Sequence, residues 1–423
     1  MSIKRNIIAN YIGTGVAVLA PILALPWYLS ELGSKQFGLI GFIAMLQAVL
    51  GMLDAGMGQA LVREISLRFN ATDQGRDRAA SLLFGFERIY WGIAFFVGVG
   101  GAVFADTFAS HWLNLEGLPV ATGRNAIYGA AAIFAAQFPG SIYRSLLVGA
   151  QAQVALNAVI SGGTLIRHFG GVIVVFLWPT FSAYIIWHAC AALLETLIRC
   201  NLAWRVLGVK RGQVIWDKQE FQEVWRVIAS MSGVALLGAL TVQMDKIILS
   251  RMVSIEQFGY YTVAATVAAG LLQLIGPLVQ AVMPRAILLR AAPIALRALY
   301  VKLSIFILVM TSLVIVIFLL VGKWLLTIWL RNPQAAEVIY PLLTVLLVGT
   351  CCNYLYNVGY LNWIVKKRIH RMLLVNTLAL VLSVLLIPPL VAWQGPIGAT
   401  FGWLSINFIG LLISLEWLKK TDE

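Results

Sequence analysis

The sequence predicts an all-α polytopic membrane protein, with about twelve transmembrane helices in two six-helix lobes, from its composition, its apolar segments and an internal repeat. Hydrophobic residues make up 60% of the 423 residues and charged residues only 12%, which excludes an ordinary soluble domain. A helix needs about 20 apolar residues to cross a hydrocarbon core about 30 Å thick. Twelve segments satisfy this requirement, at approximately 7–29, 37–61, 82–104, 125–148, 155–177, 184–204, 227–249, 259–283, 299–322, 339–361, 373–393 and 397–417.

The first span is too long for a removable signal peptide and lacks a small-residue cleavage site, so we expect it to stay as a membrane helix. Pro21 and Pro26 lie toward its outer end. Because each proline removes a backbone hydrogen bond, a kink is expected there.

The second span carries an acidic residue near its inner end. The helical period places Gln47, Gly51, Asp54 and Gly58 on one narrow face. A carboxylate at that depth is costly unless it faces a bundle interior or a water-filled cavity. We therefore expect Asp54 to point away from lipid.

The connections between spans are short, and none is large enough for a soluble domain. The longest inner one, at about 205–226, contains both acidic and basic residues and lies halfway along the chain. It is typical of a linker with an amphipathic segment at the membrane surface. We expect an N-terminal lobe at 1–205, this linker at 206–226 and a C-terminal lobe at 227–423.

An internal repeat supports this division. The segment 249–259, LSRMVSIEQFG, is similar to 29–38, LSELGSKQFG, with one residue inserted. Aligning Phe37 with Phe258 also aligns Gln59 with Gln280. Six helices per half restore the same orientation, so the repeat is parallel and its axis runs along the membrane normal. Two six-helix lobes around a central cavity are the expected result.

One stripe of residues does not follow the repeat. The polar face of the eighth span does not align with that of the second. Either the halves differ in which face meets the cavity, or one stripe is a packing seam of small residues. The polar face of the eighth span consists of Thr266, Gly270, Gln273, Pro277 and Gln280.

The distribution of the basic residues gives the orientation. The net charge is +13, and most of the 31 Lys and Arg residues lie on the same side as the N-terminus. This asymmetry is the positive-inside rule, which places both termini in the cytoplasm and indicates orientation rather than a nucleic-acid partner. The basic residues on the opposite side are Lys35, Arg124, Arg251, Lys323 and Arg331.

The cysteines predict neither a disulfide framework nor a zinc site. Cys190, Cys200, Cys351 and Cys352 lie in or beside predicted helices, without C-x-x-C spacing or partner histidines. We expect no bound metal and no cofactor.

Three motifs in order resemble those of Wzx-type O-antigen or polysaccharide flippases of the multidrug/oligosaccharidyl-lipid/polysaccharide (MOP) superfamily. The first motif is the turn-forming repeat at 29–38 and 249–259. The second is LDAGMGQALVR (53–63), which follows the first copy, and the third is QMDKIILS (243–250), which leads into the second copy. With twelve spans and a parallel repeat, the resemblance covers nearly the whole chain.

The resemblance implies translocation of an undecaprenyl-diphosphate-linked oligosaccharide from the cytoplasmic to the outer leaflet of the bacterial inner membrane. Two lobes would alternate in access, and the chain would not be an enzyme. The implied partners are the lipid-linked oligosaccharide and membrane lipids, with other polysaccharide-assembly proteins as further candidates. A diphosphate and sugars do not cross hydrocarbon unaided, so a cavity must offer cationic and hydrogen-bonding groups.

Arg167 lies in the middle of the fifth span beside His168. A central arginine costs about 3 kcal/mol on insertion scales, so a compensating group is expected. One interpretation is a cavity cation that binds diphosphate or acidic sugars. The other is an ion pair with Glu195 across the hairpin of the fifth and sixth spans, at depths of about 18 Å and about 24 Å from the turn. These interpretations are compatible with each other.

Asp54, Glu195 and Asp245 are candidates for coupling transport to protons or cations. For Asp54 the alternative is a carboxylate bonded to cytoplasmic basic groups or to a helix end. For Asp245 the alternative is an interfacial ion pair with Lys246 that holds the lobes together.

The remaining substrate-binding candidates are amides and a lysine in the second half. Amides on one helical face can bind sugar hydroxyls, or equally hydrogen-bond neighbouring helices. These candidates are Gln243, Lys246, Gln273, Gln280, Asn353 and Asn357.

Two other functions are alternatives to a flippase. A MATE-like antiporter of drugs or small metabolites would share the fold, since fold does not determine cargo. A membrane glycosyltransferase or polysaccharide polymerase would ordinarily require an acidic metal or nucleotide-sugar site in a large soluble loop, and no connection here has that size.

Overall fold

The computed structural model describes residues 3–54, 56–69 and 75–418, except for the side chains of residues 3–7, 220, 226–235 and 271–281. Every regular element in these ranges is a helix, and eight helices are long and apolar enough to cross a membrane. The chain divides into two compact units, Met1–Ala239 and Leu240–Glu423. The expected all-α polytopic membrane fold with two helical lobes is therefore confirmed. The proposed boundaries at 205 and 227 stay predictions.

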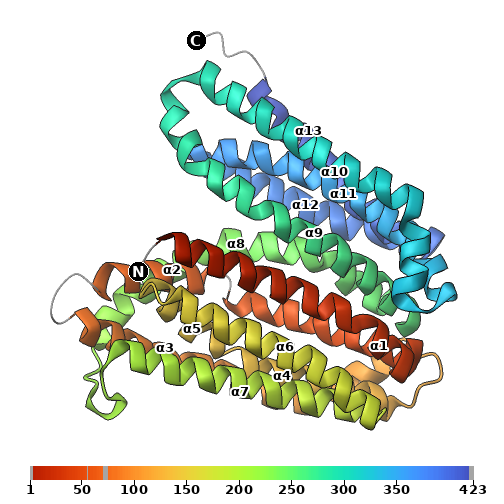
Figure 1. Ribbon diagram of the computed structural model, residues 1–423, viewed down its shortest axis with the longest axis horizontal. Coiled ribbons are helices and arrows are strands. Elements are labelled where there is room, and N and C mark those ends of the chain that lie inside the picture. Colours follow the sequence, from red (N-terminus) through yellow and green to blue (C-terminus); the bar gives the residue numbers. More distant parts are fainter. Residues whose placement is uncertain (1–2, 55, 70–74, 419–423) are drawn as a thin grey trace. The chain divides into compact units, whose positions relative to one another are not determined.

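The helices of the first unit can be followed in Figure 1 from red to green. Helix α1 packs on α6, α6 on α7, α7 on α4 and α4 on α3, while the short α2 and α5 pack on each other. The elements are α1 (Ile3–Gly51), η1 (Met52–Asp54), α2 (Met57–Phe69), α3 (Gly75–His111), α4 (Val120–Gln137), α5 (Gly140–Gly149), α6 (Gln153–Leu177), α7 (Phe181–Leu207), η2 (Arg211–Gln213) and the first part of α8 (Lys218–Met252).

Helix α1 contains the first predicted span and the first part of the second as two helical segments, one on each side of Gly33. Both Pro21 and Pro26 lie inside it, and its backbone leaves helical geometry at Gly33, with φ 76° and ψ 164°. A residue without Cβ adopts this conformation readily. The expected turn between the first two spans is therefore a single glycine kink.

The second predicted span is not one continuous helix, contrary to expectation. Helix α1 ends at Gly51, the single turn η1 ends at Asp54, and α2 begins at Met57. Gly56 lies between them with φ 81°, a left-handed conformation that favours glycine. Asp54 and Gly58 therefore belong to different helices.

The fourth predicted span is also divided. Helix α4 ends at Gln137 and α5 begins at Gly140, with Pro139 before it at φ −63° and ψ −20°. Proline lacks the N–H needed to continue the hydrogen-bond ladder, so the helix is interrupted there. The first unit thus contains two interrupted membrane helices.

One hydrophobic core cluster of the first unit is formed by side chains between Met57 and Val224. Phe86 and Tyr90 on α3 and Ile142 and Leu146 on α5 are completely buried in it. Between membrane helices such side chains contribute through van der Waals packing. The core therefore fixes α5 against α3.

The connection after α7 is attached to this core through a buried acid. Glu87 on α3 is 2% exposed and accepts a hydrogen bond from Trp204 Nε1 at 2.9 Å. Arg211 Nη2 lies 2.7 Å from the other carboxylate oxygen. A carboxylate buried this deeply requires such partners, so the predicted linker is bound to the first unit.

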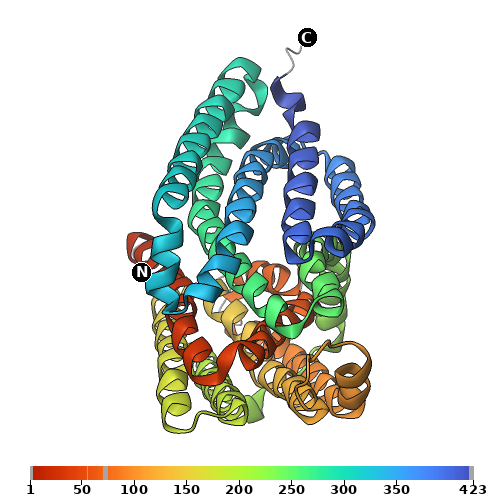
Figure 2. The ribbon, with the colours of Figure 1, turned by 90° about the vertical axis from the view of Figure 1, so that its right-hand side faces the viewer.

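The second unit is organised around α11. Its helices can be followed in Figure 2 from green to blue. Helices α9, α10 and α13 pack on α11, and α12 packs on α13. The elements are the remainder of α8, α9 (Ile255–Leu288), η3 (Leu289–Ala291), α10 (Pro293–Leu330), α11 (Pro333–Val365), α12 (Ile369–Gln394), α13 (Pro396–Ser414) and η4 (Leu415–Leu418).

We expect Gly359→Ala to destabilise the second unit by about 1–3 kcal/mol, because overpacking forces backbone shifts. A Cβ at Gly359 of α11 would lie 2.4 Å from the backbone oxygen of Ser414 on α13. Thermal unfolding of the purified protein measures the effect. Gly15→Ala is the matched control, because a Cβ there meets nothing within 4 Å. Equal unfolding temperatures for the two variants would contradict the prediction.

Candidate functional site

Asp54 lies at the interruption between η1 and α2. The Tyr90 hydroxyl, on α3, donates a hydrogen bond to Asp54 Oδ1. The Tyr90 ring stacks on Phe138 at 4.9 Å between ring centroids, and Phe138 directly follows the last residue of α4. A single tyrosine therefore contacts both interrupted helices.

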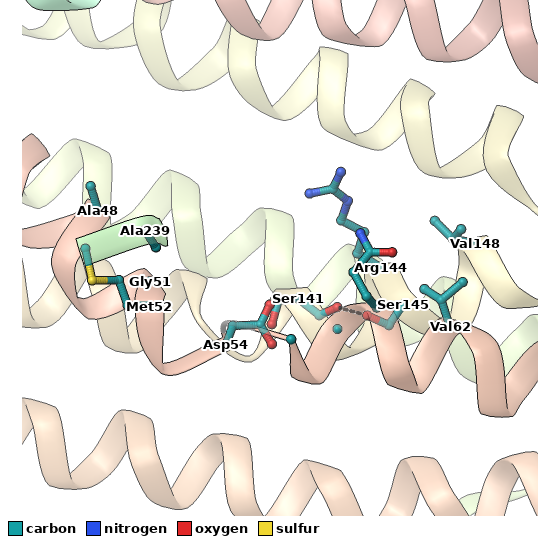
Figure 3. A pocket seen from close by; sticks show the side chains of 13 residues that line it. Ala48, Gly51, Met52, Asp54, Val62, Ser141, Arg144, Ser145, Val148 and Ala239 are labelled. Atoms are coloured by element: carbon teal, nitrogen blue, oxygen red, sulfur yellow. Dashed lines mark hydrogen bonds between the residues drawn. The ribbon is translucent and has the colours of Figure 1, made fainter. Parts of the chain in front are cut away.

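A cavity of about 660 Å³ opens beside Asp54. Figure 3 shows that residues around η1 and α2 form one wall and α5 forms another. Space at this wall is tight at Gly58. A Cβ on Gly58 would lie 3.3 Å from both Asp54 Oδ2 and Ser145 Oγ. The polar and glycine residues that line the cavity include Asp54, Gly56, Gly58, Gln59, Ser141, Arg144 and Ser145.

Helix α5 places one arginine in this cavity. Arg144 is exposed and lies between Ser141 and Ser145, and Ser145 Oγ donates to the Ser141 carbonyl at 3.0 Å. In Figure 3 the Arg144 guanidinium points away from the Asp54 carboxylate. Within the part of the chain that the structure describes, Arg144 has no ion-pair partner. Its N–H groups are therefore available to a ligand.

Arg167 on α6 forms an ion pair with Glu195 on α7, as the hairpin geometry predicts. Arg199 pairs with the same carboxylate, which is 3% exposed. Arg167 Nη1 also donates to Gln137 Oε1 at 3.0 Å, at the end of α4. Two arginines share one carboxylate, so this cluster has a net charge of +1.

The histidines near Arg167 have packing contacts. The Tyr28 hydroxyl donates to the His168 carbonyl at 2.8 Å. The His188 ring stacks on Tyr184 at 3.9 Å and lies 5.7 Å from the His168 ring. His188 Nδ1 lies 3.0 Å from the Tyr184 carbonyl. These contacts indicate that His188 packs between α6 and α7.

In the second unit, Asp245 is buried on α8. The Tyr261 hydroxyl of α9 donates to Asp245 Oδ2 at 2.5 Å, and Lys246 Nζ lies 3.4 Å from Oδ1. Gln243, two residues before Asp245, is partly buried on the same helix. The Asp245–Lys246 pair therefore forms within one helix, with Tyr261 as the contact to the next.

The two asparagines predicted to bind sugars form hydrogen bonds within the protein. Asn353 Nδ2 donates to Asn407 Oδ1 of α13 at 2.6 Å, and Asn357 Nδ2 donates to Asn353 Oδ1 at 2.9 Å. The first bond joins α11 to α13, as the interhelical alternative expects, and the second lies within α11. The side chains of Gln273 and Gln280 lie outside the described residues.

The structure thus separates the predicted residues of the first unit into two places. Arg167, His168 and Glu195 lie together on α6 and α7, whereas Asp54 lies in the cavity. Sequence reasoning missed Arg144, which counted only toward orientation, and Tyr90. The sequence signal for Arg144 is a polar face made by Ser141, Arg144 and Ser145, directly after Pro139 and Gly140.

Comparisons with known proteins agree with this fold. The family model "polysaccharide biosynthesis protein" matches residues 3–287. A search of curated proteins finds no match. The lipid II flippase MurJ, in an inward closed conformation, is 13% identical with a TM-score of 0.72, over 97% of this chain and 86% of that one.

Two further solved structures are similar. An inward-facing multidrug resistance MATE family transporter of the MOP superfamily is 13% identical with a TM-score of 0.69, over 96% of both chains. A MOP superfamily transporter from Pyrococcus furiosus is 14% identical with a TM-score of 0.61, over 98% of this chain and 93% of that one. At these identities the likeness concerns the fold alone.

Proposed function

This chain belongs to the polysaccharide biosynthesis protein family, and from that premise we propose that it is a lipid-linked oligosaccharide flippase. Its substrate is an undecaprenyl-diphosphate-linked repeat unit of O-antigen or another polysaccharide. The protein moves this unit from the cytoplasmic to the outer leaflet of the bacterial inner membrane by alternating access of two lobes. Both termini lie in the cytoplasm, and other polysaccharide-assembly proteins act before and after it.

The observation that carries this proposal is Arg144. It is a cation without an ion-pair partner in the described part of the chain, and it lines a cavity between two interrupted membrane helices. Interrupted helices near membrane depth are found where backbone lines a binding cavity. A guanidinium binds phosphate oxygens through paired N–H groups. The cavity therefore suits the diphosphate, while the lipid tail stays in hydrocarbon.

The other predicted residues have supporting roles in this proposal. The net positive charge of Arg167, Glu195 and Arg199 attracts an anionic headgroup toward the first unit. Asp54 is the proposed coupling residue, since it alone of the three acidic candidates lines the cavity. Glu195 pairs with Arg167 and Arg199, which favours its structural alternative. Asp245 bonds to Lys246 and Tyr261 within the second unit. Gln243, Lys246, Gln273 and Gln280 stay candidates for contacts to the sugars.

A MATE-like antiporter is the second candidate, and Asp54 is the observation that favours it. A carboxylate in the cavity can bind either a proton or a cationic drug. The two functions differ in the charge of the cargo. A flippase of this class should transport a diphosphate lipid and leave a lipophilic cation untouched.

The test is the sidedness of a lipid-linked oligosaccharide in vesicles that contain the purified protein. A lectin that does not cross membranes reports how much sugar is outside. We expect sugar to equilibrate across the bilayer much faster than in protein-free vesicles, and an encapsulated lipophilic cation to leave at the protein-free rate. Equal sugar exposure with and without protein would refute the flippase, and selective release of the cation would establish the antiporter instead.

A further inference from the structure

We propose that binding of the anionic headgroup at Arg144 and protonation of Asp54 favour each other, so that the headgroup and a proton occupy the first-unit cavity together. This inference rests on the proposed function and deepens it. It concerns the sign of the coupling between cargo and proton, which membership of the family leaves open.

The groups that face Asp54 come from three elements. Tyr90 on α3 donates a hydrogen bond to the carboxylate. Ser141 and Arg144 come from α5, and Gly58 comes from α2. Among the described residues that line the cavity, Asp54 and Arg144 are the ones with a formal charge.

The charge of the cavity therefore depends on one proton. With Asp54 ionised, the charges of Asp54 and Arg144 sum to zero. With Asp54 protonated, the cavity carries +1. The Tyr90 hydroxyl that donates to Asp54 serves both forms, because a protonated carboxyl keeps an oxygen that accepts. Protonation thus changes the charge without removing the contact to α3.

Arg144 and Asp54 do not neutralise each other through a direct bond. No ion pair joins them in the described part of the chain, and Figure 3 shows the guanidinium directed away from the carboxylate. A diphosphate can therefore bind Arg144 while Asp54 stays in place. An ionised Asp54 then repels the phosphate across the same cavity.

The size of this repulsion follows from Coulomb's law. Two unit charges about 8 Å apart, at an effective dielectric constant of about 20, change a binding constant about 30-fold. Linkage is reciprocal, so the anion favours proton uptake by the same factor. For a cationic cargo the sign is opposite, because cargo and proton then compete for one carboxylate. The charge of the cargo therefore decides whether a proton is released or taken up.

The experiment measures proton uptake when the full-length protein binds farnesyl diphosphate, a short-chain probe of the headgroup. Isothermal titration calorimetry in buffers of different ionisation enthalpy gives the number of protons taken up. Asp54→Asn is the matched variant, since its amide oxygen can still accept from Tyr90. Arg144→Gln tests whether the probe occupies the cavity.

We expect wild type to take up more protons than Asp54→Asn, by up to one, and to bind the probe more tightly as the pH is lowered, after correction for the probe's own titration. The Asp54→Asn variant should bind the probe tightly at low and at high pH. If Asp54→Asn does not fold, the comparison is made between wild type and the titration of the free probe.

The outcomes separate the two proposals. Tight binding that depends on Arg144, with equal proton uptake in wild type and Asp54→Asn, overturns the coupling and leaves the flippase standing. Smaller proton uptake by wild type than by Asp54→Asn also overturns it. Absence of binding to wild type at any pH overturns both.

Discussion

Replacing Arg144 with Gln is expected to lower the affinity for a diphosphate lipid, and the initial rate of its translocation at limiting substrate, by about 10- to 100-fold. One charge-assisted hydrogen bond to the phosphate is lost, which contributes about 1.5–3 kcal/mol. The expectation depends on Arg144 lining the cavity without an ion-pair partner in the described ranges. Since Arg144 has no hydrogen bond or ion pair to lose among the described residues, the unfolding temperature should stay unchanged.

Two variants sharpen this measurement in the vesicle assay. Arg144→Lys keeps the charge but loses the paired N–H geometry, so its rate should fall between those of wild type and Arg144→Gln. Arg124→Gln is the matched control, because Arg124 pairs with Asp106 at an exposed position. A normal rate for a folded Arg144→Gln variant would remove this residue from the site.

Replacing Glu195 with Ala is expected to destabilise the first unit by about 3–5 kcal/mol, the usual result of breaking a buried ion pair on one side. Arg167 and Arg199 both pair with this carboxylate, and both side chains are largely buried. Without it, two guanidinium groups face each other in a medium of low dielectric constant. The thermal unfolding midpoint should fall by roughly 10 °C.

Two comparisons identify the cause. Asp106→Ala breaks the exposed Arg124–Asp106 pair and should leave the midpoint nearly unchanged. The triple variant Arg167→Met, Glu195→Leu and Arg199→Met removes all three charges, and should recover most of the lost stability. A Glu195→Ala variant as stable as wild type would show that the arginines have other counter-ions. If the triple variant folds and transports normally, Arg167 has no part in the site.

The membrane fold could be predicted from the sequence because length and hydropathy act on each segment by itself. Most of each predicted span lies on helix within the described residues, and the first two spans lie on either side of Gly33. The ion pair of Arg167 with Glu195 could also be foreseen, since a helical hairpin sets the depth of both residues. Local geometry was sufficient in these cases.

The interruptions at Gly56 and Pro139 limited the prediction of the site. A helical period assumes a continuous helix, so it placed Asp54 and Gly58 on one face although they belong to η1 and α2. The helical period also gave no reason to assign Arg144 a role beyond the positive-inside rule. The bond from Asn353 to Asn407 depends on packing between residues 54 positions apart, which no local pattern reveals.

The composition of the first unit's core has a consequence for how the protein is made. The cluster of buried side chains described above comes from residues 57 to 224, and Arg211 forms an ion pair with Glu87. Synthesis proceeds from the N-terminus, and domains generally fold as units in that order. All residues needed for the cavity at Asp54 and for this core have therefore left the ribosome before most of the second unit is translated. The first unit can form the cavity beside Asp54 while the second unit is still being inserted.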